Sequence, residues 1–132
     1  MIVVDASVLA NALADDGADG ATARDRLTSA GELAAPDLID VETVAVLRKR
    51  WIASDLTDQR LSDAIDDLED LDLTRYPTLP LMRRAFELRS NMTAYDAAYI
   101  ALAERLDCSL LTADQRLATA PTITCPVEVL HT

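Results

Sequence analysis

The chain opens with a short apolar run that ends at an acid, because Met1–Val4 is followed directly by Asp5. Such a run is typical of a buried strand, and the apolar residues Val8, Leu9 and Leu13 then recur at helical spacing. The predicted order is therefore strand, acid, helix. In open α/β sheets, ligands bind in the crevice outside the carboxyl ends of the strands. The opening thus predicts that Asp5 lies in a binding crevice at one edge of a sheet.

Strand and helix patterns alternate along the rest of the chain. Residues 15–20 should form an acidic loop, Asp37 is placed to cap a long helix with Leu38, Val41 and Ala45 on one face, and Tyr95 falls on the apolar stripe of a later helix. Further strands are expected at 33–35, 73–76, 109–112 and 127–130, and helices at 23–29, 38–50, 58–71, 80–88 and 93–106, with a helical turn at 116–118. This alternation predicts one α/β domain over residues 1–132, with a central, mainly parallel twisted sheet flanked by helices.

Half of the 132 residues are apolar, which is enough for a sizeable core, yet the formal charge is −11. That acidity argues against binding of nucleic acid by a positive field, because neutralising phosphates needs clustered Lys and Arg. A divalent cation could screen the acids, so a polyanionic substrate would fit a metal-dependent protein. Cys108 and Cys125 lack zinc-site spacing and are expected to be free thiols, with a disulfide between them as the alternative. With no signal-peptide pattern and no apolar run approaching about 18 residues, the protein is expected to be cytoplasmic.

Four acids fall at expected strand ends or helix starts, and each has an ordinary explanation. Asp5 and Asp114 could simply cap the helices that follow them. Glu42 lies early in a helix, where the helix dipole favours a carboxylate. Thr93 and Asp96 have the spacing of a capping box. Taken one at a time, the four acids therefore require no special function.

The same acids are more informative together. Asp114 closely follows an apolar strand, as Asp5 does, and adjacent parallel strands would place both carboxylates at one edge. The helix after Asp96 is apolar nearly all round, so its start is expected to lie against the sheet. Carboxylates so close repel each other unless a cation lies between them. Oxygen-only ligands suit Mg²⁺ or Mn²⁺, which predicts a metal site formed by Asp5, Glu42, Asp96 and Asp114.

Four stretches of the sequence share their order and spacing with a known family. They are residues 2–7, Pro36 followed by Glu42 on a helix, residues 93–103 and residues 111–117. Together they resemble the PIN domain, specifically the VapC-type toxins of bacterial toxin–antitoxin pairs. The resemblance implies a compact α/β fold, a Mg²⁺- or Mn²⁺-dependent ribonuclease activity on RNA, a homodimer and inhibition by a cognate antitoxin. By position, it implies that the catalytic and metal-binding acids are Asp5, Glu42, Asp96 and Asp114, with Ser7 and Thr112 as supporting polar residues.

The basic residues supply candidate contacts to RNA. They are Arg48, Lys49, Arg50, Arg83, Arg84, Arg89 and Arg116. The ordinary alternative for most of them is a surface salt bridge with one of the many acids.

A metal-dependent mechanism is expected because histidine is scarce. The single histidine, His131, lies next to the end of the sequence, which argues against a histidine pair acting with the RNA 2′-hydroxyl. One or two Mg²⁺ held by Asp5, Asp96 and Asp114 would lower the pKa of a bound water and clamp the phosphate, while Glu42 orients a water or completes the shell. Such hydrolysis would leave a 5′-phosphate and a 3′-hydroxyl.

Other protein classes also place an acid after the first strand. A phosphatase of the haloacid dehalogenase type needs a second Asp where this chain has Ser7, and a catalytic Lys, whereas the only Lys, Lys49, lies in a basic cluster. A receiver-like Mg²⁺-binding signalling module needs an acidic pair after the first strand and a mid-chain phosphoacceptor Asp, which the pattern does not provide. A PIN domain kept only for binding is a third alternative, against which the intact set of acids argues.

Overall fold

The computed structural model describes residues 1–130, so His131 lies outside the described residues. The described chain has five strands: β1 (Ile2–Val4), β2 (Leu33–Pro36), β3 (Thr74–Tyr76), β4 (Ser109–Thr112) and β5 (Val127–Val129). Its helices are α1 (Ala6–Ala14), α2 (Ala18–Ser29), α3 (Ile39–Ile52), α4 (Asp58–Asp70), the 3-10 turn η1 (Leu79–Leu81), α5 (Met82–Glu87), α6 (Ala94–Leu106) and α7 (Gln115–Ala118). The predicted alternation of strands and helices is confirmed.

The strands form one sheet in the order β3-β2-β1-β4-β5, and the pairings are parallel throughout. The predicted central parallel sheet is therefore confirmed. β1 lies in the middle, with Val4 in register with Leu111 of β4. The chain builds outward from β1 to β3 on one side and from β4 to β5 on the other, so the strand order reverses between β1 and β4. Such a reversal opens a crevice at the carboxyl ends of the two strands.

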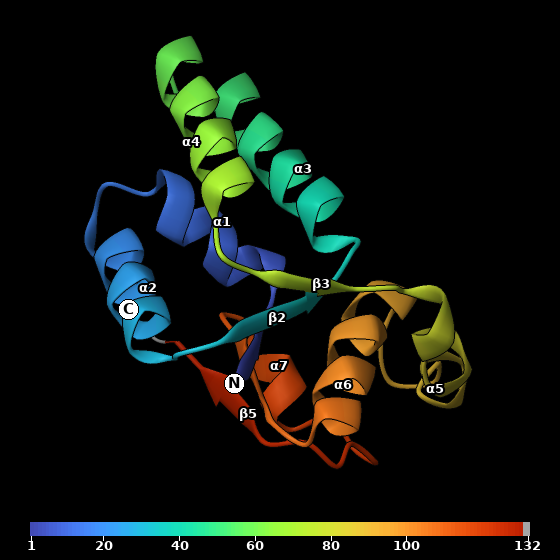
Figure 1. The fold of residues 1–132 in the computed structure, drawn as a ribbon. Coiled ribbons are helices and arrows are strands. Elements are labelled where there is room, and N and C mark those ends of the chain that lie inside the picture. Colours follow the sequence, from blue (N-terminus) through green and yellow to red (C-terminus); the bar gives the residue numbers. More distant parts are fainter. Residues whose placement is uncertain (131–132) are drawn as a thin grey trace.

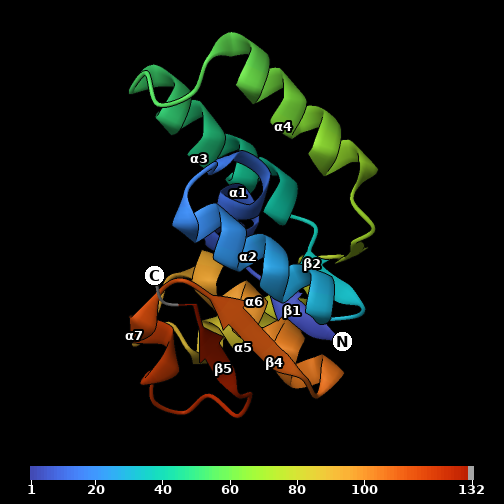
Figure 2. The same ribbon diagram turned by 90° about the vertical axis from the view of Figure 1, so that its left-hand side faces the viewer.

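Helices cover both faces of this sheet (Figure 1). α1 to α4 lie on one side, where α1 contacts α2, α3 and α4, and α5 and α6 lie on the other, where α6 packs against β1, β2 and β4. Figure 2 shows the hairpin of α3 and α4 extending away from the sheet. Because helices in βαβ units run opposite to the strands, α1 and α6 both begin at the carboxyl edge of β1.

The long helix α3 differs from its prediction in both cap and inner face. It begins after Leu38 without a side-chain cap, and Asp37 instead accepts a hydrogen bond from the Thr78 hydroxyl. Its buried stripe is Ile39, Thr43 and Leu47, whereas the predicted face residue Val41 is 75% exposed. The expected face was wrong because a threonine occupies the centre of the true stripe and interrupts its apolar pattern.

Two smaller expectations also require correction. The acidic loop is shorter than predicted, since α2 begins at Ala18 rather than near residue 23. Gly20 makes this possible, because a Cβ at that position would lie 1.7 Å from the Asp15 carbonyl oxygen. Tyr95 is 63% exposed rather than part of the buried stripe, since the buried part of α6 begins at Ala97. None of the helices in residues 1–130 is long and apolar enough to cross a membrane.

Candidate active site

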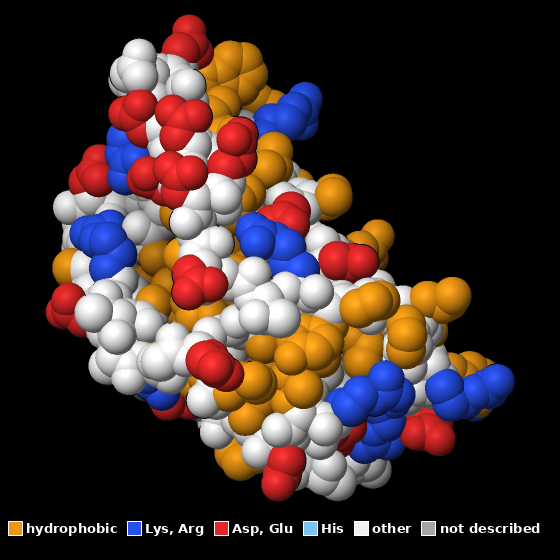
Figure 3. Space-filling model, in the orientation of Figure 1, with side chains coloured by type: hydrophobic (Ala, Val, Ile, Leu, Met, Phe, Trp, Pro, Cys, Tyr) orange, Lys and Arg blue, Asp and Glu red, His pale blue; other side chains and the backbone are white. Residues whose placement is uncertain are grey.

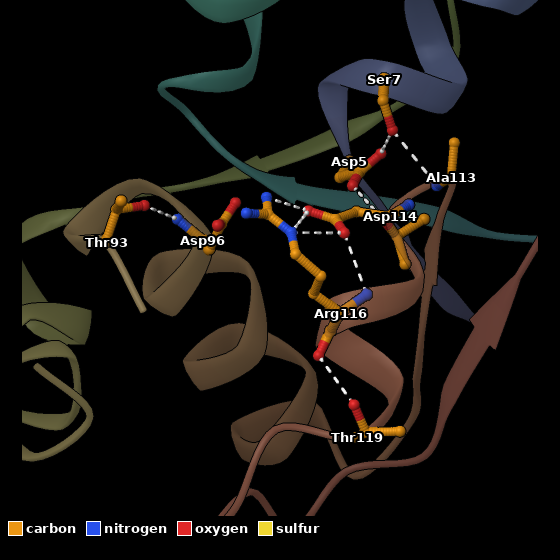
Figure 4. Close-up of polar contacts among 9 residues, drawn as sticks. Asp5, Ser7, Thr93, Asp96, Ala113, Asp114, Arg116 and Thr119 are labelled. Atoms are coloured by element: carbon orange, nitrogen blue, oxygen red, sulfur yellow. Dashed lines mark hydrogen bonds and ion pairs between the residues drawn. The ribbon is translucent and has the colours of Figure 1, made fainter. Parts of the chain in front are cut away.

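Asp5 closes β1 and begins α1, and it is only 9% exposed. Its Oδ1 accepts hydrogen bonds from Ser7 Oγ at 2.6 Å (Figure 4) and from the Val8 amide at 3.2 Å. Its Oδ2 accepts a hydrogen bond from Thr112 Oγ1. Asp5 therefore does cap α1, but the Thr112 contact also joins it to β4. Burial raises the pKa of Asp5, although these hydrogen bonds favour its charged form.

The hydroxyl groups of Ser7 and Thr112 tie the ends of β1 and β4 together. Besides donating to Asp5, Thr112 Oγ1 accepts the Asp114 amide at 3.0 Å and Ser7 Oγ accepts the Ala113 amide at 3.2 Å. Each hydroxyl thus bridges Asp5 and the segment that follows β4. The orientation of the Asp5 carboxylate is therefore set by both strands.

Asp96 reaches the same edge of the sheet from the first turn of α6. The Thr93 hydroxyl accepts the Asp96 amide at 3.2 Å and caps the helix, as predicted. Figure 4 shows the Asp96 carboxylate pointing toward Arg116 and Asp114. Burial and the nearby Asp114 charge raise the pKa of Asp96, and Arg116 opposes this effect. The charge of Asp96 in turn helps to raise the pKa of Asp5, so these acids repel one another.

Glu42 comes to the group from α3, the helix on the opposite face of the sheet. The hydroxyl of Tyr99, a buried residue of α6, donates to Glu42 Oε1 at 2.8 Å. Burial raises the pKa of Glu42, and the charges of Asp96 and Asp5 raise it further against the effect of the Tyr99 hydrogen bond. Burial of Tyr99 itself and the charge of Glu42 raise the pKa of Tyr99. The Tyr99 hydroxyl therefore stays protonated and available as a donor.

The sequence interpretation assigned Tyr99 to an apolar stripe and did not include it in the site. Its available signal was a hydroxyl placed three positions after Asp96, which puts both side chains on one helix face. Its partner could not be read from the sequence, because Glu42 lies 57 positions away.

Asp114 follows β4 and caps α7 by accepting the Arg116 amide at 3.0 Å. The Arg116 guanidinium also contacts both oxygens of this carboxylate, with Nη2 2.6 Å from Oδ2. These bonds hold the pKa of Asp114 below its ordinary value. Because the Arg116 side chain is 85% exposed, this corner of the site faces solvent, whereas Asp5 is buried.

The four predicted acids thus lie in one region, although within residues 1–130 no three Asp, Glu, His or Cys side chains are placed to hold an ion together as they stand. The chemistry of the donors nevertheless fits a hard divalent cation. They are all carboxylates, and burial and mutual repulsion raise the pKa of Asp5, Glu42 and Asp96. A cleft of about 150 Å³ beside Asp96, Asp114 and Arg116 gives access from solvent.

Comparison with known proteins identifies the family to which the chain belongs. The sequence pattern of the PIN domain matches residues 2–122. The chain belongs to the PIN domain family. As a PIN domain it is 42% identical over 130 residues to the VapC ribonuclease Mb0985 of Mycobacterium bovis, covering 98% of both chains. It is also 39% identical over 130 residues to ribonuclease VapC1 of Mycobacterium tuberculosis, covering 98% of this chain and 97% of the relative.

Solved structures show the same PIN fold at lower sequence identity. VapC20 of Mycobacterium tuberculosis, described as a sarcin–ricin loop cleaving toxin, aligns with a TM-score of 0.67 at 17% identity over 83% of this chain and 87% of its own. VapBC2 of Rickettsia felis, bound to a DNA fragment from its promoter, aligns with a TM-score of 0.68 at 15% identity over 99% and 100%. The relatives at 42% and 39% identity confirm the resemblance to VapC-type PIN domains, and the comparisons favour neither the phosphatase nor the receiver-like alternative.

Three of the seven predicted RNA contacts of this PIN domain are held by polar side chains of the chain itself. Arg50 donates to Asn11 Oδ1 at 2.6 Å, and Arg84 donates to Glu104 at 2.8 Å. Arg116 is held by Asp114. For Arg84 and Arg116 the salt-bridge alternative describes the structure.

The other four basic residues have no ion pair within residues 1–130. Arg48 and Lys49 are exposed on α3. Arg83 and Arg89 lie over the ring of Phe86, a residue of α5. The role of all seven in binding RNA stays a prediction.

Proposed function

We propose that this PIN domain is a divalent-metal-dependent endoribonuclease that hydrolyses RNA phosphodiester bonds. One observation carries the proposal: Asp5, Glu42, Asp96 and Asp114 come from separate elements to the crevice beside β1 and β4, and three of them have raised pKa values. Buried acids that repel one another oppose folding and are typical of functional sites. The full-length relatives named as VapC ribonucleases support the same activity.

In this proposal Asp5, Asp96 and Asp114 hold Mg²⁺ or Mn²⁺, which supplies neutralisation of the phosphate charge and a lowered pKa for a bound water. Asp5 acts as the fixed ligand, because Ser7 and Thr112 keep its carboxylate in one orientation. Tyr99 holds Oε1 of Glu42, so Oε2 is the oxygen that orients a water or completes the shell.

We also propose that the protein is a cytoplasmic toxin that forms a homodimer and is neutralised by a cognate antitoxin. The structural neighbours described as a toxin and as a VapBC assembly support this role. The bidentate contact between Arg116 and Asp114 indicates that a guanidinium fits against these acids. An antitoxin arginine could therefore bind the acidic site in place of the metal.

The activity is tested by incubating a panel of labelled RNAs with Mg²⁺ or with EDTA, with the isosteric variant Asp5→Asn as the matched control. We expect cleavage by the wild type only with metal, leaving 5′-phosphate and 3′-hydroxyl ends. Asp5→Asn should lose about a hundredfold or more in rate while keeping its circular dichroism spectrum. Cleavage in EDTA, a 2′,3′-cyclic phosphate product, or wild-type rates in Asp5→Asn would contradict the proposal.

A further inference from the structure

The exposed aromatic ring of Phe86 on α5 has two arginine side chains close to it. The guanidinium carbon of Arg89 lies 4.2 Å from the ring centroid of Phe86, and that of Arg83 lies 5.8 Å from it. Phe86 is 53% exposed. Lys and Arg side chains gather beside hydrophobic surface over α5, at the lower right of Figure 3. We call Arg83, Phe86 and Arg89 the stacking patch.

Neither arginine of the stacking patch forms an ion pair within residues 1–130. The arginines that form ion pairs within residues 1–130 are Arg26, Arg60, Arg75, Arg84 and Arg116. Arg84 lies on the same helix and is held by Glu104 and Glu87. Arg89, in contrast, donates to the Phe86 carbonyl oxygen at 3.0 Å, which fixes it beside the ring without neutralising it. The patch is therefore cationic on a protein of net charge −11.

The stacking patch is joined by a tight turn to the candidate active site. The amides of Asn91 and Met92 donate to the Leu88 carbonyl oxygen at 3.0 and 3.3 Å, and Thr93 then caps α6. The side chains of this turn line the cleft that Asp96 and Asp114 share. Arg89 and Thr93 are four positions apart, which limits their Cα separation to about 14 Å. A single-stranded nucleic acid could span both surfaces.

We propose that the stacking patch binds a base and its neighbouring phosphates in single-stranded RNA, beside the phosphate that the acids cleave. An aromatic face stacks on any base, and arginines neutralise phosphates. Because the chain as a whole carries a net charge of −11, a local cationic surface is what a polyanionic substrate needs. A twofold contact between copies through this patch would instead bring its arginines against each other. The inference rests on the proposed ribonuclease function and adds the surface that selects unpaired RNA.

The test separates binding from cleavage by using the Asp5→Asn protein as parent. Its affinity for a fluorescein-labelled single-stranded RNA in Mg²⁺ is measured by fluorescence anisotropy. Phe86→Leu keeps apolar bulk without an aromatic face and should weaken binding about tenfold, whereas Phe86→Trp should retain it. Replacing Arg83 and Arg89 by Ala should lower the salt-dependence slope by about 1 to 2. As a charge control, Arg24→Ala on α2 removes one arginine elsewhere and should bind like the parent, whereas Arg89→Ala alone should bind more weakly.

Several results would overturn the inference. They are unchanged affinity in Phe86→Leu, equal loss in Phe86→Leu and Phe86→Trp, or no RNA binding by the parent. A change of oligomeric mass in Phe86→Leu, measured by analytical ultracentrifugation, would show that the patch is a contact between copies instead. The proposed function is read separately, from metal-dependent cleavage by the protein with native Asp5. Cleavage that persists while the Phe86 variants bind normally would reject only the stacking patch.

Discussion

Helix α6 carries an acid near each end, and the fold treats the two in opposite ways. Glu104, near the end, accepts hydrogen bonds from Arg84 at 2.8 Å and from the amide and hydroxyl of Thr124 at 2.7 and 2.9 Å. Although burial alone would raise it, these bonds lower the pKa of Glu104. At the start of the same helix, burial and the charge of Asp114 raise the pKa of Asp96. The two ends thus differ in the partners that the fold supplies.

This difference separates a structural acid from a functional one. Glu104 links α5, α6 and the segment before β5, and its charge is satisfied within the chain. Asp5, Glu42 and Asp96 remain close together with their charges only partly opposed by Arg116 and by hydroxyl donors. Retaining such repulsion lowers stability, and a site that binds a cation is a physical reason to retain it.

The largest expected effect is on activity at the start of α6. Asp96→Asn keeps the shape of the side chain and removes its charge, so metal-dependent RNA cleavage should fall about a hundredfold or more. Its free energy of unfolding in EDTA should be equal to or up to about 1 kcal/mol above that of the wild type, because repulsion is relieved. Cleavage assays and urea unfolding measure the two quantities. A clear loss of stability would place Asp96 among the structural acids.

The opposite pattern is expected near the end of α6. Glu104→Gln should lower the free energy of unfolding by about 1–2 kcal/mol, because it weakens charge-assisted hydrogen bonds that are only partly screened by solvent. Cleavage per folded molecule should be unchanged. The control is Glu87→Gln, which removes the more exposed partner of Arg84 at 3.3 Å and should change stability by no more than about 0.5 kcal/mol. Loss of activity in folded Glu104→Gln protein would break the comparison.

Sequence patterns predict the ends of strands better than the partners of acids. Asp5 and Asp114 could be placed at one edge because two apolar strands end near them and parallel strands share an edge. Asp96 could be placed because Thr93 marks the start of its helix. Glu42 carried little signal, since its position depends on how α3 packs, and the predicted inner face of that helix was wrong. Local spacing fixes an element, whereas tertiary packing selects its face.

The sequence alone does not predict which arginine forms an ion pair with which acid. Arg84 was a candidate RNA contact like Arg83 and Arg89, and the pattern offers no reason why it alone should bind Glu104, 20 positions away. That choice depends on where α5 docks on α6. Compensated and uncompensated residues therefore look alike in the sequence until the helices are packed. The sequence could thus predict which edge of the sheet carries the acids, but not their electrostatics.

The smallest expected effect is on the pH dependence of the free energy of unfolding in metal-free protein. This dependence should have opposite signs for Asp96 and Glu104. The raised pKa of Asp96 means that the native state binds its proton more tightly than the unfolded state, so the cost of its charge is present at pH 7. The stability advantage of Asp96→Asn should shrink as the pH falls through that raised pKa toward 3.8. The lowered pKa of Glu104 gives a stabilising contribution that is present at pH 7 and is lost as the pH falls below 4.5. Urea unfolding in EDTA between pH 7 and pH 3 measures both, and the Asp96 effect should be small because solvent screens a half-buried carboxylate. An Asp96→Asn advantage that grows on acidification would mean that its charge is compensated in the native fold, as the charge of Glu104 is.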